Sequence, residues 1–189
     1  MMMLTDIIAD LEKKLKRDRF VHTRGVAEVS VRLAKLYGVD EQEAELAAWL
    51  HDCARVYPTS ALIEECARRD IPVAEIDRQS PILLHAPLGV YLAKHVYGVE
   101  NNAVLDAIAY HTVGREQMTT LERIVYLADM IEPSRDYDGV ELLRKLAEED
   151  LSRAMVAAFD QSIAHVIHGR GLLHPNTILA RNELLMNER

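Results

Sequence analysis

Six ionisable side chains lie on faces of the expected helices that are otherwise apolar, and together they suit a metal ion. They are His22, His51, Asp52, His85, His111 and Asp129. Residues three or four positions apart share one face of a helix; His22 lies four before Val26, and Asp129 lies four after Val125. Burying an imidazole or a carboxylate without a partner is costly. A transition metal ion would satisfy all six, because both groups are good ligands for iron, manganese, zinc or cobalt.

The adjacent pair His51-Asp52 supports the same prediction. In a helix expected to run from a cap at Asp40 through Trp49 to about residue 54, neighbouring side chains point about 100° apart. The pair would therefore reach one ion from two directions, with His22 and Asp129 supplying ligands from other helices. A single histidine on an apolar face is more often an ordinary core residue, so the prediction depends on all six groups together.

The elements that must position these groups are helices. Apolar residues recur with helical spacing almost throughout the chain, and the alternating pattern of a strand is almost absent. The expected helices cover about 20–37, 40–54, 61–69, 81–97, 103–111, 120–132 and 140–168, with short ones at each end of the chain and an irregular connection at 71–80. We therefore predict an all-α, single-domain multi-helix bundle over 1–189, with its core at about 18–133 and a C-terminal helical portion at about 134–189.

The composition of the chain limits the kinds of molecule that it could bind. The chain has 189 residues and a net charge of −8, which argues against a nucleic-acid or anionic-membrane surface, since those need massed Lys and Arg. Cys53 and Cys66 are too few for a disulfide framework. The chain shows no secretion signal and no run of about 20 apolar residues. We expect a cytoplasmic protein that acts on a small molecule; its oligomeric state is left open, with a homodimer as one option.

The order of the six groups resembles a known superfamily. It matches the H…HD…D pattern of the HD-domain metal-dependent phosphohydrolases, with His85 and His111 as the added histidines of one subset. Over about residues 5 to 185 the chain closely resembles the YqeK family, bacterial HD-domain symmetrical bis(5′-nucleosyl)-tetraphosphatases. The strings that carry this resemblance are R-x-x-H-T-R-G-V at 19–26, A-W-L-H-D at 48–52, L-L-H-A-P-L-G at 83–89, A-I-A-Y-H-T-V-G at 107–114 and I-V-Y-L-A-D-M-I-E-P-S-R at 124–135.

The resemblance implies symmetrical hydrolysis of diadenosine tetraphosphate to two ADP molecules, with all six groups catalytic. Iron is the implied metal, and cobalt, manganese or zinc are the alternatives. His22, His51, Asp52 and Asp129 are expected to hold it, and the ion would activate a water molecule and polarise a phosphoryl oxygen. Two roles stay open for His85 and His111: they could form a second metal site, or contact the phosphates and transfer protons.

Substrate contacts are expected at two arginine side chains, at groups of the metal centre and in one loop. Arg19 and Arg135 belong to the resemblance, and the arginine fork suits a phosphate. His22, Asp52, His85, His111 and Thr112 are also expected to touch the nucleotide. The string G-R-G-L-L-H-P-N-T at 169–177 is predicted to be a nucleotide-contacting loop rather than a plain turn, through Leu172, Leu173, His174, Pro175, Asn176 and Thr177. Glu132 is expected to be a helix cap or a solvated charge, and His165 and His168 to be surface or core residues.

Two other functions share these features. One is an HD-type phosphohydrolase for another nucleotide, such as a deoxynucleoside triphosphate or a ppGpp-like molecule. The other is a non-catalytic module that senses nucleotide and binds metal only structurally. A cyclic-dinucleotide phosphodiesterase of the HD-GYP type is disfavoured, because the sequence contains no G-Y-P string.

Overall fold

The chain folds into helices joined by short connections. The computed structural model describes residues 2–187, and no strand is present among them. The α-helices are α1 (Leu4–Lys14), α2 (Arg17–Tyr37), α3 (Glu41–Leu50), α4 (Leu62–Ala67), α5 (Glu75–Gln79), α6 (His85–His95), α7 (Asn102–Tyr110), α8 (Thr120–Ile131), α9 (Val140–Glu149), α10 (Leu151–His168) and α11 (Pro175–Asn187). Three 3₁₀ turns lie at Cys53–Val56, Thr59–Ala61 and Pro81–Leu84. The all-α prediction is confirmed, although short α5 lies in the stretch expected to be irregular.

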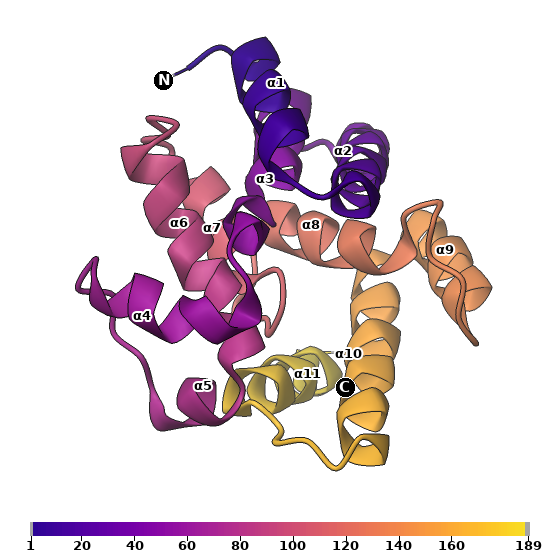
Figure 1. Cartoon of the computed structure of the whole chain (residues 1–189). Helices are drawn as coiled ribbons and strands as arrows, with labels where there is room; N and C mark the ends of the chain where they lie inside the picture. The colour runs from indigo at the N-terminus through magenta and orange to yellow at the C-terminus, as the bar shows by residue number, and fades with distance from the viewer. Residues whose placement is uncertain (1, 188–189) are drawn as a thin grey trace.

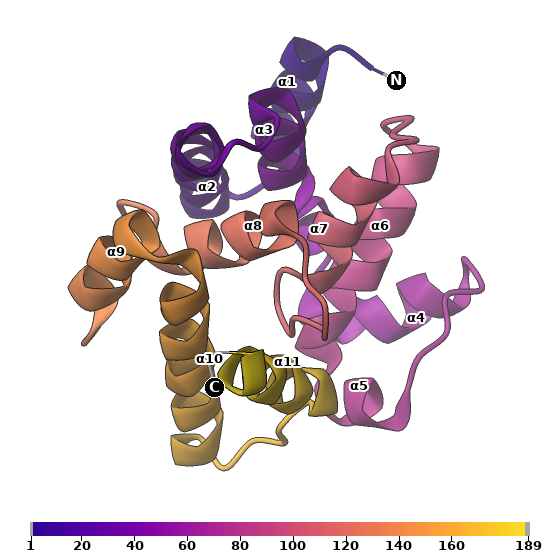
Figure 2. The ribbon, with the colours of Figure 1, turned by 180° about the vertical axis from the view of Figure 1, so that it is seen from behind.

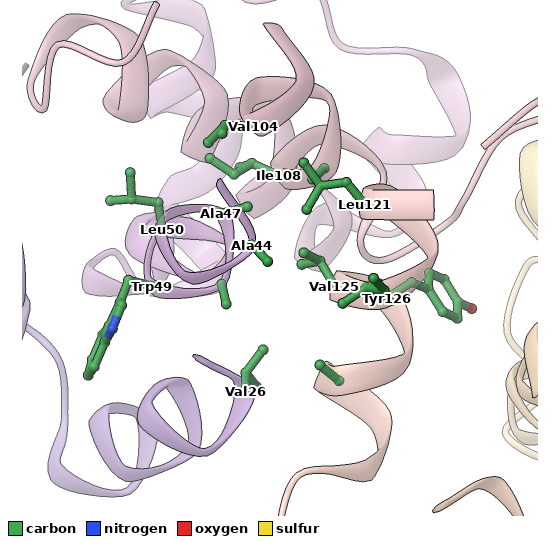
Figure 3. Packing of buried hydrophobic residues seen from close by; sticks show 14 of the residues in the cluster. Val26, Ala44, Ala47, Trp49, Leu50, Val104, Ile108, Leu121, Val125 and Tyr126 are labelled. Carbon is green, nitrogen blue, oxygen red and sulfur yellow. The ribbon is translucent and has the colours of Figure 1, made fainter. Parts of the chain in front are cut away.

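Helix α8 lies at the centre of the molecule, between α2 and α3 on one side and α10 on the other (Figures 1 and 2). Val26, Ala47, Ile108 and Val125 are buried where α2, α3, α7 and α8 meet (Figure 3). Helix α3 contributes small residues such as Ala44 and Ala47 to this contact, and small side chains let helix axes approach closely. Because the predicted metal ligands lie on or beside these helices, this packing sets the distances between them.

Helix α3 ends before the His51-Asp52 pair and not at about residue 54. Its last residue is Leu50; His51 keeps helical dihedral angles, whereas Asp52 has φ −107° and ψ 15°. The Asp52 side chain does not cap a helix here; its carboxylate accepts from Arg19 and Arg55 instead. The pair therefore lies at a helix terminus, followed by the 3₁₀ turn Cys53–Val56, and the prediction of two neighbours inside one helix is wrong.

The single long helix predicted over 140–168 is also wrong, because the chain breaks at Asp150. This residue has an extended backbone (φ −157°, ψ 107°), and its side chain accepts hydrogen bonds from the backbone N–H groups of Ser152 and Arg153 at 3.0 and 3.1 Å. This is N-capping by an aspartate. Helices α9 and α10 consequently take different directions, and α10 leads down to α11 (Figure 1).

Among the helices of residues 2–187, none is long and apolar enough to cross a membrane.

Candidate metal centre

Four histidines direct the same ring nitrogen to one region, because each engages its other nitrogen in a hydrogen bond. In His51, His85 and His111 the partner of Nδ1 is the backbone carbonyl oxygen three residues earlier, at 2.6, 2.5 and 2.7 Å. In His22 the partner is Glu132 Oε1, at 3.0 Å. A carbonyl oxygen can only accept, so Nδ1 carries the proton and Nε2 of the neutral ring keeps its lone pair.

The Nε2 atoms converge on each other and on two carboxylates. His85 Nε2 lies 2.9 Å from His111 Nε2 and 3.3 Å from Asp52 Oδ1. His51 Nε2 lies 3.6 Å from Asp52 Oδ2, and His22 Nε2 lies 3.1 Å from Asp129 Oδ1. The Nε2 atoms of His22 and His51 are buried without a hydrogen-bond partner. Lone pairs this close repel one another unless a cation lies among them, so these residues fit a metal ion.

Two overlapping sets of groups could each hold an ion. One is His22, His51 and Asp129, and the other is His51, Asp52 and His111; within each set the ligand atoms lie within 4.8 Å of one another. His51 belongs to both sets. Of the two additional histidines, the second set includes His111 and not His85.

Three arginines compensate the charge of the two aspartates. Arg19 Nη1 lies 2.8 Å from Asp52 Oδ2, and Arg55 Nε lies 3.2 Å from Asp52 Oδ1. Arg135 donates to the carboxylate and to the backbone carbonyl of Asp129, at 2.6 and 2.7 Å. These guanidinium groups border the centre, where they could also contact a phosphate. Arg55 was not among the predicted residues, although its position three residues after Asp52 was a usable signal.

The surroundings of His51, His85, Asp52 and Asp129 favour the protonation states that a cation requires. Burial lowers the pKa of His51 to about 4 and that of His85 to about 3, so both rings are neutral near pH 7. Burial opposes ionisation of Asp52 and Asp129, but the imidazole and guanidinium groups in contact with them outweigh it and hold the pKa of both carboxyl groups below the usual range. Metal ligands must be unprotonated in this way.

Glu132 occupies the C-cap position of α8, as one of the two expectations had it, but its side chain lies inside the structure, so the alternative of a solvated charge is wrong. Its side chain is only 1% exposed. Besides His22, it contacts the backbone N–H and the hydroxyl of Ser134, at 2.7 and 2.5 Å. Its spacing of three from Asp129, which places both on one face of α8 and its end, was the sequence signal for this role.

A cavity of about 870 Å³ adjoins the centre. This lies within the range of small-molecule sites, roughly 300–1,000 Å³. Its walls come from the end of α8, from α10 and from the 169–174 loop, and they are largely apolar. Thr112 joins the cavity to the centre: it lines the cavity, and its Oγ1 lies 3.2 Å from His85 Nε2 and 3.0 Å from His111 Nε2.

Six of the thirteen predicted substrate contacts line this cavity, namely Thr112, Arg135, Leu172, Leu173, His174 and Thr177. Pro175 and Asn176 do not line it: Pro175 begins α11, and the Asn176 N–H donates to His174 Nδ1 at 3.2 Å. Arg19 also lies outside the cavity wall, beside Asp52. The exposed residues His165 and His168, to which the sequence assigned no role, do border the cavity.

Comparison with known proteins agrees with this geometry. The HD domain family model matches residues 19–134. A symmetrical bis(5′-nucleosyl)-tetraphosphatase of Bacillus subtilis (strain 168) is 38% identical over 95% of this chain and 96% of its own. The chain belongs to the symmetrical bis(5′-nucleosyl)-tetraphosphatase family. Its HD domain holds all six of the convergent histidines and aspartates, since residues 22 to 129 fall inside the matched range.

Two further proteins are similar to this member of the tetraphosphatase family. A probable nicotinate-nucleotide adenylyltransferase/Ap4A hydrolase of Mycoplasma pneumoniae is 36% identical over 76% of this chain and 42% of its own length. The crystal structure of a predicted HD superfamily hydrolase involved in NAD metabolism, from Clostridium acetobutylicum, superimposes with a TM-score of 0.95. It is 42% identical and covers 99% of both chains. The fold of that hydrolase is therefore shared along nearly the whole chain.

Proposed function

We propose that this protein is a metal-dependent hydrolase that cleaves diadenosine tetraphosphate symmetrically into two ADP molecules. The observation that carries the proposal is the convergence of four histidine Nε2 atoms and two carboxylates beside a cavity of nucleotide size, in a chain whose relatives are symmetrical tetraphosphatases. The water oxygen bonds to one of the two central phosphorus atoms. The bond from that phosphorus to the central bridging oxygen breaks, and the oxygen leaves with the other ADP.

His22, His51, Asp52 and Asp129 are the residues that we assign to the metal. When bound, the ion supplies activation of a water molecule and polarisation of a phosphoryl oxygen. The Nε2 atoms of His85 and His111 lie 2.9 Å apart, on the side of the metal centre that faces the cavity, next to Thr112. Their uncommitted Nε2 atoms can hold a proton from the attacking water or bind a phosphate oxygen, and they can also complete a second ion site.

The substrate occupies both the cavity and the centre. An apolar wall that includes Val113, Met130 and Leu173 suits a nucleoside, whose base exposes two flat apolar faces. Arg135 lines the cavity and also touches Asp129, so it can bind phosphates between the nucleoside and the metal. Arg19 and Arg55 lie on the Asp52 side, where they can bind the phosphates of the second nucleotide.

The proposal also covers the identity of the metal, the domain organisation and the location of the protein. We assign iron as the metal because the family resemblance implies it. Cobalt, manganese or zinc could replace it, because a ligand set that mixes imidazole and carboxylate suits all four metals. One domain comprising 1–189 carries both the ligands and the cavity. We place the protein in the cytoplasm, acting on a free nucleotide rather than on nucleic acid or a membrane, in keeping with its net charge of −8.

Product analysis tests this function. Purified protein is incubated with diadenosine tetraphosphate and ferrous or cobalt ion, and the nucleotides are separated by anion-exchange chromatography. We expect ADP as the only product, and none from the Asp52→Ala variant. AMP plus ATP would contradict symmetrical cleavage. Absence of turnover, with hydrolysis of a deoxynucleoside triphosphate or of ppGpp instead, would indicate another HD-type phosphohydrolase, and tight nucleotide binding without turnover would indicate a sensor.

A further inference from the structure

Among the four convergent histidines, His22 is held by a different kind of group. The other three direct Nδ1 to a neutral backbone carbonyl, whereas His22 directs it to the Glu132 carboxylate at 3.0 Å. The two residues are 110 positions apart and lie on α2 and at the end of α8. A carboxylate is a stronger acceptor than a carbonyl and makes the imidazole a more basic ligand.

Several hydrogen bonds hold the Glu132 carboxylate beside His22. Its side chain is 1% exposed, and Ser134 fixes it through the backbone N–H at 2.7 Å and the hydroxyl at 2.5 Å. The Arg144 side chain on α9 donates to the backbone carbonyls of Ile131, Glu132 and Arg135, at 3.0, 2.9 and 2.9 Å. Backbone and side chain of Glu132 are thus both restrained.

Helix α2 leaves room for this carboxylate at one glycine. Gly25 lies three residues after His22, and a Cβ atom there would come 2.7 Å from Glu132 Oε2, which is closer than such atoms approach. It would also lie 3.3 Å from Glu132 Cβ and from Pro133 Cδ. An alanine at this position would therefore displace the carboxylate that holds His22.

We propose that Glu132 is a positioning residue of the metal centre, acting through His22. It accepts the Nδ1–H of His22, selects the tautomer in which Nε2 is unprotonated, aims that nitrogen toward Asp129 and strengthens its donation to a divalent transition metal. Gly25, Ser134 and Arg144 maintain the contact. This inference rests on the proposed metal site, which it deepens by identifying the residue that orients one ligand.

Cobalt binding by the full chain tests the inference without measuring catalysis. Co²⁺ affinity is measured by chelator competition, and the visible absorption of the bound ion reports the ligand geometry. We expect Glu132→Gln to weaken Co²⁺ binding by about 10- to 100-fold and to change the absorption spectrum. Glu122→Gln is the matched control, because Glu122 lies on α8 and is 1% exposed, as Glu132 is, but it pairs with Arg115 and touches none of the histidines. We expect this control to leave both readouts unchanged.

Each outcome bears on a different claim. If the unaltered chain binds no Co²⁺, the proposed metal site itself fails. If the unaltered chain and Glu132→Gln bind Co²⁺ with equal affinity, the role of Glu132 is overturned while the proposed function stands. The same conclusion follows if the control Glu122→Gln loses as much Co²⁺ affinity as Glu132→Gln. Should Glu132→Gln not fold, Gly25→Ala and Ser134→Ala, which keep the carboxylate but disturb its position, are each expected to weaken Co²⁺ binding severalfold. Unchanged affinity in both would overturn the inference.

Discussion

The charge states of individual histidines make the metal-free protein sensitive to acid. His51 and His85 have a pKa of about 4 and about 3 in the fold because they are buried, against about 6.5 when unfolded. Between pH 6.5 and 4 the unfolded chain therefore binds more protons than the folded one, and the free energy of unfolding falls as pH falls. His22 opposes this in part, because the Asp129 and Glu132 carboxylates outweigh burial and raise its pKa.

We expect the net loss between pH 7 and pH 5 to be on the order of 2 kcal/mol, since one pKa unit corresponds to about 1.4 kcal/mol. Urea denaturation of the metal-free protein at the two pH values measures it. A free energy of unfolding that is equal or higher at pH 5 would show that these two rings are not held neutral by burial.

At the residue scale, periodicity was enough to predict the six convergent groups but not their neighbours. His22, His51 and Asp129 each lie at a helical spacing from buried apolar residues, and that pattern is visible in one segment at a time. The contact of His22 with Glu132 joins residues 110 positions apart. The spacing of Glu132 from Asp129 indicates that it lies near the site, but no local pattern identifies His22 as its partner. The individual roles of the six groups stay predictions.

At the scale of elements, the turn after α7 depends on Gly114. Its φ is +69°, and an added Cβ would lie 2.8 Å from the Phe159 ring of α10. Gly38 at the end of α2 has the same φ of +69° but nothing within 4 Å. Gly38→Ala should therefore cost only backbone strain, roughly 1–2 kcal/mol. Gly114→Ala should cost that strain plus overpacking, roughly 1–3 kcal/mol more.

Thermal or chemical unfolding of the two variants separates these contributions. Equal destabilisation by Gly38→Ala and Gly114→Ala would mean that Phe159 moves aside freely, and that the turn carrying Thr112 is not fixed by α10.

Helix existence was predictable, but two helix boundaries were not. Apolar spacing continues from α9 into α10, so it predicts one helix; the break comes from a single capping side chain, Asp150. Similarly, α3 ends at Leu50, although the pattern continues beyond it. At Asp150 the side chain competes with the helix for backbone hydrogen bonds, and such competition is weak evidence in a sequence. At Asp52 the backbone itself leaves the helical region, with φ −107° and ψ 15°, and the side chain pairs with Arg19 and Arg55.

At the scale of the whole molecule, the cavity arises where the C-terminal helices meet the HD domain. Loop residue Leu173 forms part of its wall but contacts none of the six convergent groups. In the proposed complex Leu173 would bury its side chain against the nucleotide, so Leu173→Ala would lose about 0.8 kcal/mol for each CH₂ removed. We expect KM for diadenosine tetraphosphate to rise about tenfold with kcat and Co²⁺ affinity unchanged. Steady-state kinetics measure this; a fall in kcat at constant KM would place the loop in the chemical step.

The existence of this cavity could not be predicted from the sequence. The string at 169–177 suggested a nucleotide-contacting loop, and Leu172, Leu173, His174 and Thr177 do line the cavity. Its opposite wall includes Met130 and Ile163, from α8 and α10, whose approach depends on the break at Asp150. Pocket shape therefore follows from tertiary packing, which periodicity does not report.

Metal removal tests the central claim most directly. The protein is stripped of metal with a chelator, and hydrolysis of diadenosine tetraphosphate is followed while ferrous or cobalt ion is added back, for the unaltered chain and for Asp52→Asn. We predict no hydrolysis without metal, a rise to a plateau as metal is restored, and no recovery by Asp52→Asn at the same metal concentrations. Full turnover by the metal-free protein, or equal recovery by Asp52→Asn, would contradict a catalytic metal held by these histidines and aspartates.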